Sequence, residues 1–136
     1  MRKQLVAYAL VLFTPACLAV PPDAIVIMKS EGDYLNILPD GSANAGFGTL
    51  RPCATVAEGT FDFALLLQSE LAEEQVIRHE RRTAATDYIS VGFSRNGSAR
   101  MYHFANRLLI EQLLQRAERN ARIIDPDVAC PFPAAS

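Results

Sequence analysis

The chain has 136 residues, 50% of them hydrophobic and 21% charged, with a formal net charge of −2. A chain of this length suits one domain of ordinary size. Its mild acidity argues against a nucleic-acid partner, because a surface that binds phosphates needs a net basic face.

Residues 1–19 have the pattern of a secretory signal peptide. A basic start precedes an apolar run at residues 5–13, and small residues lead to a cleavage point after Ala19. The apolar run is shorter than the roughly 20 residues that cross a bilayer, and no longer run follows, so we expect no transmembrane segment. The sequence predicts export, most simply to a bacterial periplasm. Residues 20–136 are then a single α+β domain with an irregular C-terminal tail.

A lipid anchor is the alternative to this cleavage. Cys17 could be the modified first residue of a bacterial lipoprotein. Residues 14–16 lack the large aliphatic side chain that usually stands three positions before such a cysteine, so cleavage after Ala19 is the favoured interpretation.

The first part of the mature chain predicts three strands. Residues 24–29 are rich in β-branched side chains, residues 34–37 alternate with a period of two, and residues 30–33 form the turn between them. Residues 39–41, Pro-Asp-Gly, fit a type I turn that ends on a left-handed glycine. The returning strand, residues 42–47, is small and flat, which leaves self-assembly through this strand as a further possibility.

The same bend has some features of a calcium-binding loop, but the spacing of its residues excludes such a loop. Such a loop needs oxygen ligands at positions 1, 3 and 5, glycine at 6 and an acidic residue at 12. Counting from Asp40 gives Ser42 and Asn44, but then Ala45 and Arg51. We therefore interpret the run as a plain hairpin bend.

Two helices are predicted. Thr60 is expected to cap the first, residues 61–72, whereas the charged residues 73–86 predict a long surface connection. Asn106 is expected to cap the second, which runs to about residue 121 with an apolar stripe along one side.

Residues 87–104 form the clearest hairpin of the sequence, with its bend at Asn96–Gly97. A two-residue bend places Tyr102 and Phe104 on the buried face of the hairpin. A three-residue bend would place their neighbours there instead, because a register shift of one residue moves every side chain to the opposite face of the sheet. We predict the two-residue bend, since it buries the larger aromatic side chains.

In chain order these elements read β-ββα-ββα. The sequence therefore predicts an α+β fold: an antiparallel sheet of about five strands with two helices packed on one face. The mature chain keeps two cysteines, Cys53 and Cys130, and such a pair in an oxidising compartment predicts one disulfide.

The catalytic and metal-binding signals are sparse. His103 lies opposite Ser90 in the predicted hairpin and Asp87 starts its first strand, but no nucleophile elbow or oxyanion-hole pattern accompanies them. Met101 shares a strand face with His103, and Met28 could approach both, a donor set suited to a soft copper ion. We expect no catalytic, metal or cofactor site. The alternative is a small periplasmic hydrolase or metal-binding protein centred on His103.

A basic cluster offers the best candidate contact surface. Arg78, Arg81 and Arg82 could pair bidentately with carboxylates of a partner, and the polar strand face with Tyr88 and His103 adds to them. The other interpretation of the cluster is a solvated loop. We hypothesise a small exported, non-catalytic binding protein that neutralises or regulates a protein partner in the envelope, in the manner of an immunity protein or inhibitor.

Overall fold

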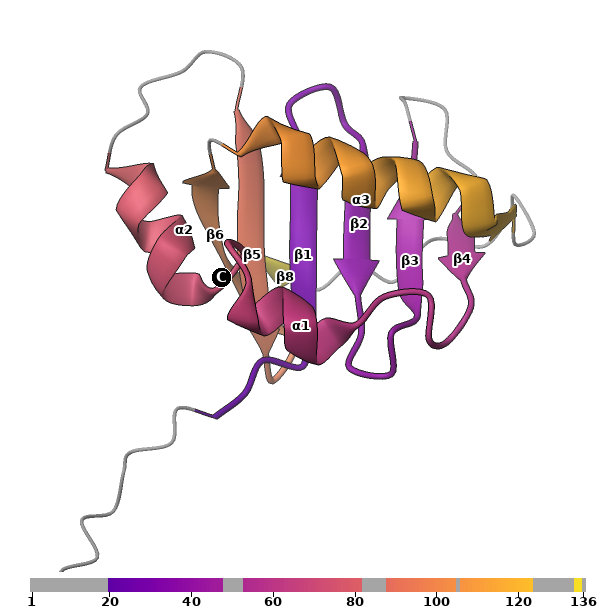
Figure 1. Cartoon of the computed structure of the whole chain (residues 1–136), viewed down its shortest axis with the longest axis horizontal. Coiled ribbons are helices and arrows are strands. Elements are labelled where there is room, and N and C mark those ends of the chain that lie inside the picture. The colour runs from indigo at the N-terminus through magenta and orange to yellow at the C-terminus, as the bar shows by residue number, and fades with distance from the viewer. Residues whose placement is uncertain (1–19, 48–52, 82–87, 105, 124–133, 136) are drawn as a thin grey trace, which may run out of the picture.

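The computed structural model describes residues 20–47, 53–81, 88–104, 106–123 and 134–135. Within these residues, eight strands form one sheet in the order β7-β4-β3-β2-β1-β5-β6-β8 (Figure 1). The strands are β1 (Ala24–Lys29), β2 (Tyr34–Ile37), β3 (Ala43–Gly46), β4 (Ala54–Val56), β5 (Ile89–Arg95), β6 (Ser98–Phe104), β7 (Ala121–Ile123) and β8 (Ala134–Ala135). All neighbouring strands pair antiparallel except β6 and β8, which run parallel.

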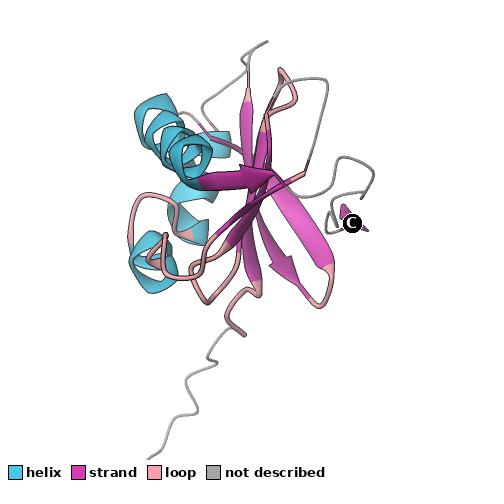
Figure 2. Cartoon of the chain, turned by 90° about the vertical axis from the view of Figure 1, so that its right-hand side faces the viewer, coloured by secondary structure: helices cyan, strands magenta, loops and turns pink. Residues whose placement is uncertain are grey.

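The helices of the described chain cover one face of this sheet (Figure 2). They are α1 (Phe63–Gln68), α2 (Glu73–Glu80) and α3 (Arg107–Asn120). The core lies between the two layers and takes fully buried side chains from the strands, from the helices and from the turn between α1 and α2, among them Ile25, Ile27, Leu35, Ile37, Leu71, Val76, Val91 and Ile110. The α+β class, the antiparallel pairing and the placement of helices on one face are confirmed.

The sheet is larger than the predicted five strands. β4 and β7 have three residues each and pair with one another, which extends the sheet beyond β3. A strand of three residues is too short to show a period-two pattern, so its existence depends on partners distant in sequence. β7 and β8 follow the last helix and are absent from the predicted strand order, whereas residues 124–133 of the predicted irregular tail lie outside the described residues.

The first helix begins later than predicted and has a different cap. The Asp62 carboxylate accepts a hydrogen bond from the backbone N–H of Leu65 at 2.9 Å, whereas the Thr60 hydroxyl donates to a carbonyl of the preceding turn. The Ser69 hydroxyl donates to the Leu66 carbonyl at 2.7 Å and ends the helix. Serine side chains compete with the helical hydrogen bonds in this way, so α1 ends at Gln68, four residues before the predicted end of the helix at residue 72.

Residues 73–80, predicted as a surface connection, form the third helix, α2. Two glutamates stand in its first turn and Arg78 and His79 in its last, an arrangement that complements the helix dipole. Val76 is completely buried and anchors the helix to the core. The rest of the predicted connection, residues 82–86, lies outside the described residues.

The bend between β2 and β3 is confirmed as a hairpin turn. Gly41 has a φ of +78°, the left-handed conformation that the Pro-Asp-Gly pattern predicts. The Asp40 carboxylate accepts hydrogen bonds from the Ser42 hydroxyl and from the Ser42 backbone N–H, and both hold the pKa of Asp40 below its usual value. The returning strand β3 lies between β2 and β4, so both of its edges are paired and self-assembly through this strand has no free edge to use.

The β5–β6 hairpin adopts the predicted register. Arg95 pairs with Ser98 across a two-residue bend in which Asn96 and Gly97 have φ values of +54° and +80°. Both positive φ values are those of the type I′ turn that Asn-Gly favours. Tyr102 and Phe104 are consequently buried on the helix-covered face, 5% and 3% exposed.

The last helix, α3, follows its predicted boundaries closely. The Asn106 side chain accepts a hydrogen bond from the backbone N–H of Leu109 at 3.3 Å and caps the helix, as predicted. Lys29 of β1 reaches α3 through an ion pair with Glu111 at 2.9 Å. Glu111 raises the pKa of Lys29 above its usual value against the opposing effect of burial, and Glu31 adds to the rise.

Several predicted features involve residues outside the described ranges. The signal peptide at residues 1–19 and the lipid-anchor candidate Cys17 are among them. Cys53 is a buried disulfide cysteine, but Cys130 lies outside the described residues, so the pairing of these two stays a prediction. None of the described helices is long and apolar enough to cross a membrane.

Candidate functional site

Four predicted contact residues gather at one corner of the molecule. Arg78 and Arg81 lie at the C-terminal end of α2, Tyr88 directly precedes β5, and His103 stands near the end of β6. α2 packs beside β6, and both elements end on the same side of the molecule (Figure 1). We call these four residues the α2–β6 corner. Arg82, the fifth predicted contact residue, lies outside the described part of the chain.

Contacts at both ends hold α2 against the sheet. Near its C-terminal end, the His79 ring meets the Phe104 ring edge-on, with centroids 5.3 Å apart and an interplanar angle of 84°. At its N-terminal end, Glu73 forms an ion pair with Arg95 at 2.8 Å. With Val76 buried between them, these contacts fix the position from which α2 presents its arginines.

The two arginines of the corner are exposed to solvent. The ion pairs among the described residues involve Lys29 and Arg95, and none involves Arg78 or Arg81. Three residues apart on a helix, these two side chains are neighbours on its surface. Their guanidinium groups are therefore available to the carboxylates of another molecule.

Tyr88 and His103 form the aromatic part of the corner. Their ring centroids lie 4.7 Å apart at an angle of 55°, and Tyr88 is 44% exposed. His103 is also exposed and belongs to the sheet face opposite the helices, because Tyr102 and Phe104 on either side of it point into the core. The arginines and the aromatic pair thus flank the β6 edge from the two faces of the sheet.

A further cation stands beside the corner on β6. The Arg100 guanidinium carbon lies 5.6 Å from the centroid of the Tyr102 ring, within the range of a cation–π contact. Burial raises the pKa of the Tyr102 phenol above its usual value, and the positive charge of Arg100 opposes this rise. The negative charges of Glu73 and Glu80 on α2 also raise the pKa of the phenol, so both positive and negative charges lie around the corner.

The predicted pairing of Ser90 with His103 is present. The Ser90 hydroxyl lies 3.5 Å from Nδ1 of His103, at the limit of a hydrogen bond. Ser90 is only 6% exposed and stands in β5, which pairs with β1 on one side and β6 on the other. Asp87, the third member of the predicted set, lies outside the described residues.

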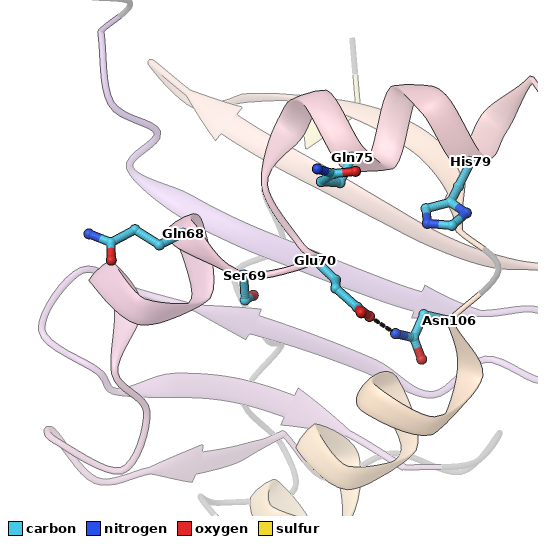
Figure 3. A pocket seen from close by; sticks show the side chains of 6 residues that line it. All are labelled: Gln68, Ser69, Glu70, Gln75, His79 and Asn106. Carbon is cyan, nitrogen blue, oxygen red and sulfur yellow. Dashed lines mark hydrogen bonds between the residues drawn. The ribbon is translucent and has the colours of Figure 1, made fainter.

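A pocket of about 650 Å³ opens next to the corner, between the α1–α2 turn and the start of α3 (Figure 3). The residues that line it are polar: Gln68, Ser69, Glu70, Gln75, His79 and Asn106. The Asn106 amide donates a hydrogen bond to the Glu70 carboxylate across this pocket. The same side chain caps α3, so Asn106 links the turn, the pocket and the helix.

The sequence does not predict this pocket, because the residues that line it come from three separate elements. Only Asn106 had a predicted role, as a helix cap. The break of the first helix at Ser69, which turns Glu70 toward the start of α3, is the step that the apolar pattern of residues 61–72 conceals. The available signal was Ser69-Glu70, a polar pair that interrupts the apolar run before Leu71.

Replacing Asn106 with alanine is expected to lower the free energy of unfolding by about 1 kcal/mol, the usual effect of losing a helix cap. Chemical denaturation of the two proteins measures the difference. Gln75→Ala is the matched control, because Gln75 lines the same pocket without capping a helix. Equal destabilisation by the two substitutions would contradict a capping role for Asn106.

No family model, curated protein or solved structure matches the chain.

Proposed function

We propose that this protein is an exported, non-catalytic binding protein that docks on an acidic protein partner in the envelope through the α2–β6 corner. One observation carries the proposal: two exposed arginines that lack an ion pair with the described residues share a corner with an exposed tyrosine–histidine pair. Arginine and tyrosine are among the residue types enriched where binding energy concentrates in protein interfaces.

The chemistry of the corner favours carboxylates on the partner. A guanidinium group binds a carboxylate with two parallel hydrogen bonds, which gives both strength and orientation. Tyr88 and His103 offer flat, partly apolar surface beside these charges at little cost in side-chain entropy. A partner with acidic side chains around an apolar contact would match this arrangement, and the protein would neutralise or regulate it in the manner of an immunity protein or inhibitor.

The non-catalytic part of the proposal rests on the surroundings of Ser90. A nucleophilic serine needs an exposed oxygen, a histidine within close hydrogen-bond reach and donors for the oxyanion. Ser90 is largely buried, and its distance from His103 is long. The backbone of β5 is engaged in two strand ladders, so the amides next to Ser90 are poorly placed to form an oxyanion hole.

Export and the disulfide belong to the same proposal. We infer that the signal peptide is removed after Ala19, with a lipid anchor at Cys17 as the alternative, and that Cys53 pairs with Cys130. Intact-mass analysis of the protein from its native envelope distinguishes these products, because cleavage leaves Val20 as the first residue whereas lipidation retains Cys17 and adds acyl chains.

Affinity capture from envelope extract, with a charge-reversed variant beside the wild-type protein, tests the proposed surface. Arg78→Glu with Arg81→Glu is expected to weaken partner binding by about tenfold or more, because like charges at an interface repel strongly. Binding is measured as the amount of partner retained at increasing protein concentration.

The chain offers a closely matched control for this variant. Arg116 and Arg119 are also exposed arginines three residues apart, on α3 instead of α2. Arg116→Glu with Arg119→Glu makes the same change in net charge and should leave partner binding within about twofold of the wild type, as expected for a site outside the interface. Equal loss in both variants, or capture of no partner by the wild-type protein, would contradict the proposal.

A further inference from the structure

The fold brings both internal methionines of the chain to one place. The chain has three methionines, of which Met1 starts the predicted signal peptide. The other two, Met28 and Met101, are 73 positions apart in sequence, yet they stand on β1 and β6, the two strands that flank β5. Ile27 in β1 and Tyr102 in β6, each next to one of the methionines, belong to the core. Because side chains alternate along a strand, both methionines belong to the other face of the sheet, opposite the helices (Figure 2).

His103 completes a set of three donors on this face. Met28 pairs with Ser90 and Ser90 pairs with His103, so Met28 and His103 occupy one row across β1, β5 and β6. Met101 is two residues before His103 on β6 and lies in the next row, opposite Gly92. Because β5 lies between them, β1 and β6 are about 10 Å apart, a distance that long side chains from both strands can span.

The residues of β5 between these donors are unusually small. Gly92 offers no side chain, and the Met101 sulfur lies over it, in the space that a Cβ atom at this position would need. Ser90 is the other residue of β5 on this stretch of the face, and its hydroxyl lies beside Nδ1 of His103. Small residues at both positions let thioether and imidazole groups approach one another above β5.

The accessible atoms of the three side chains are soft donors. Met28 is 36% exposed, and the exposed His103 has Nδ1 toward Ser90, which leaves Nε2 as its second nitrogen. Thioether sulfur selects Cu(I) over harder divalent ions, and imidazole also binds copper well. The described residues contain no cluster of three histidine, cysteine or acidic side chains, the ligands that zinc, calcium or magnesium would use.

We propose that Met28, Met101 and His103 form a binding site for a soft monovalent metal ion, Cu(I), on the face of the sheet opposite the helices. The Ser90 hydroxyl orients the imidazole through Nδ1, and Gly92 gives the Met101 thioether its position. This site shares His103 with the α2–β6 corner but takes both methionines from outside that corner, so the methionine variants test metal binding separately from the proposed partner binding.

Anaerobic titration of the mature, oxidised protein with Cu(I), in competition with a chromophoric Cu(I) chelator, tests the site. We expect one ion per chain. Met28→Leu and Met101→Leu should each weaken binding by about tenfold or more, at least the effect seen for residues that only support metal ligands. Leucine has nearly the volume of methionine, so both variants should keep their fold, which thermal unfolding checks.

His79→Ala is the control for His103→Ala, because His79 is the other histidine of the chain and lies on α2, on the opposite face. His103→Ala should weaken Cu(I) binding and His79→Ala should not. Titration with Ag(I), a redox-inert substitute, should shift both methionine methyl resonances together and saturate at one equivalent. Failure to compete with the chelator, or unchanged affinity in the folded Met28→Leu/Met101→Leu double variant, would overturn the proposal.

Discussion

Replacing Gly41 with alanine is expected to lower the free energy of unfolding by about 2–4 kcal/mol. Gly41 combines a φ of +78° with a Cβ position that would overlap the carbonyl oxygen of Phe61. The contact cannot relax easily because the Phe61 N–H donates to the Gly41 carbonyl at 3.0 Å, and the Gly59 N–H donates to the Asp40 carbonyl at 2.9 Å. Two backbone hydrogen bonds thus connect the bend of the first hairpin to the turn that leads into α1.

Gly59→Ala separates the two causes of this loss. Gly59 has nearly the same φ, +77°, but a Cβ there would have no atom within 4 Å. Its substitution should cost only the strain of the left-handed conformation, about 1–2 kcal/mol. Urea denaturation of both variants gives the comparison. If the Gly41 and Gly59 variants lose equal stability, then the close approach of Phe61 to the bend is unimportant to the fold.

Loss of the predicted disulfide is expected to have an effect of similar size. Cys53 is 3% exposed and directly precedes β4, whereas Cys130 lies beyond β7 in sequence. A bridge between them would close a loop of 77 residues (53 to 130), and the loop-entropy relation gives about 4 kcal/mol for a bridge of that span. The bridge would tie the C-terminal segment to the β4–β7 side of the sheet.

Reducing the mature protein should therefore lower its free energy of unfolding. Replacing both cysteines, in the Cys53→Ala/Cys130→Ala double variant, should lower it by the same amount. The double variant should then be insensitive to added reductant. Peptide mapping without reduction identifies the pair directly. A free Cys130 thiol in the oxidised, folded protein would show that the predicted pairing is wrong.

Local chemistry explains which parts of the fold the sequence predicts well. β1 matches its predicted residues, 24–29, because a run of β-branched side chains needs no partner to be recognised. The register of the β5–β6 hairpin follows from Asn96–Gly97, since both residues accept positive φ. Asn106 was recognisable as a cap because its side chain acts on its own helix.

The elements that sequence reasoning missed depend on distant partners. β4 is a strand because it pairs with β3 and β7, and β7 is a strand because it pairs with β4. α2 has one completely buried residue, Val76, so its apolar stripe is too thin to show as a helical period. The residue types of the α2–β6 corner were predicted, but their convergence required the packing of His79 against Phe104.

Side-chain footprinting of the protein bound to its captured partner tests the proposed docking surface most directly. Hydroxyl-radical labelling read by mass spectrometry compares Tyr88, 44% exposed at the corner, with Leu108, 71% exposed on α3. If the partner docks on the α2–β6 corner, then labelling of Tyr88 and His103 falls in the complex while labelling of Leu108 stays unchanged. Protection of Leu108 with unchanged labelling of Tyr88 and His103 would contradict the proposed function and place the interface on another surface.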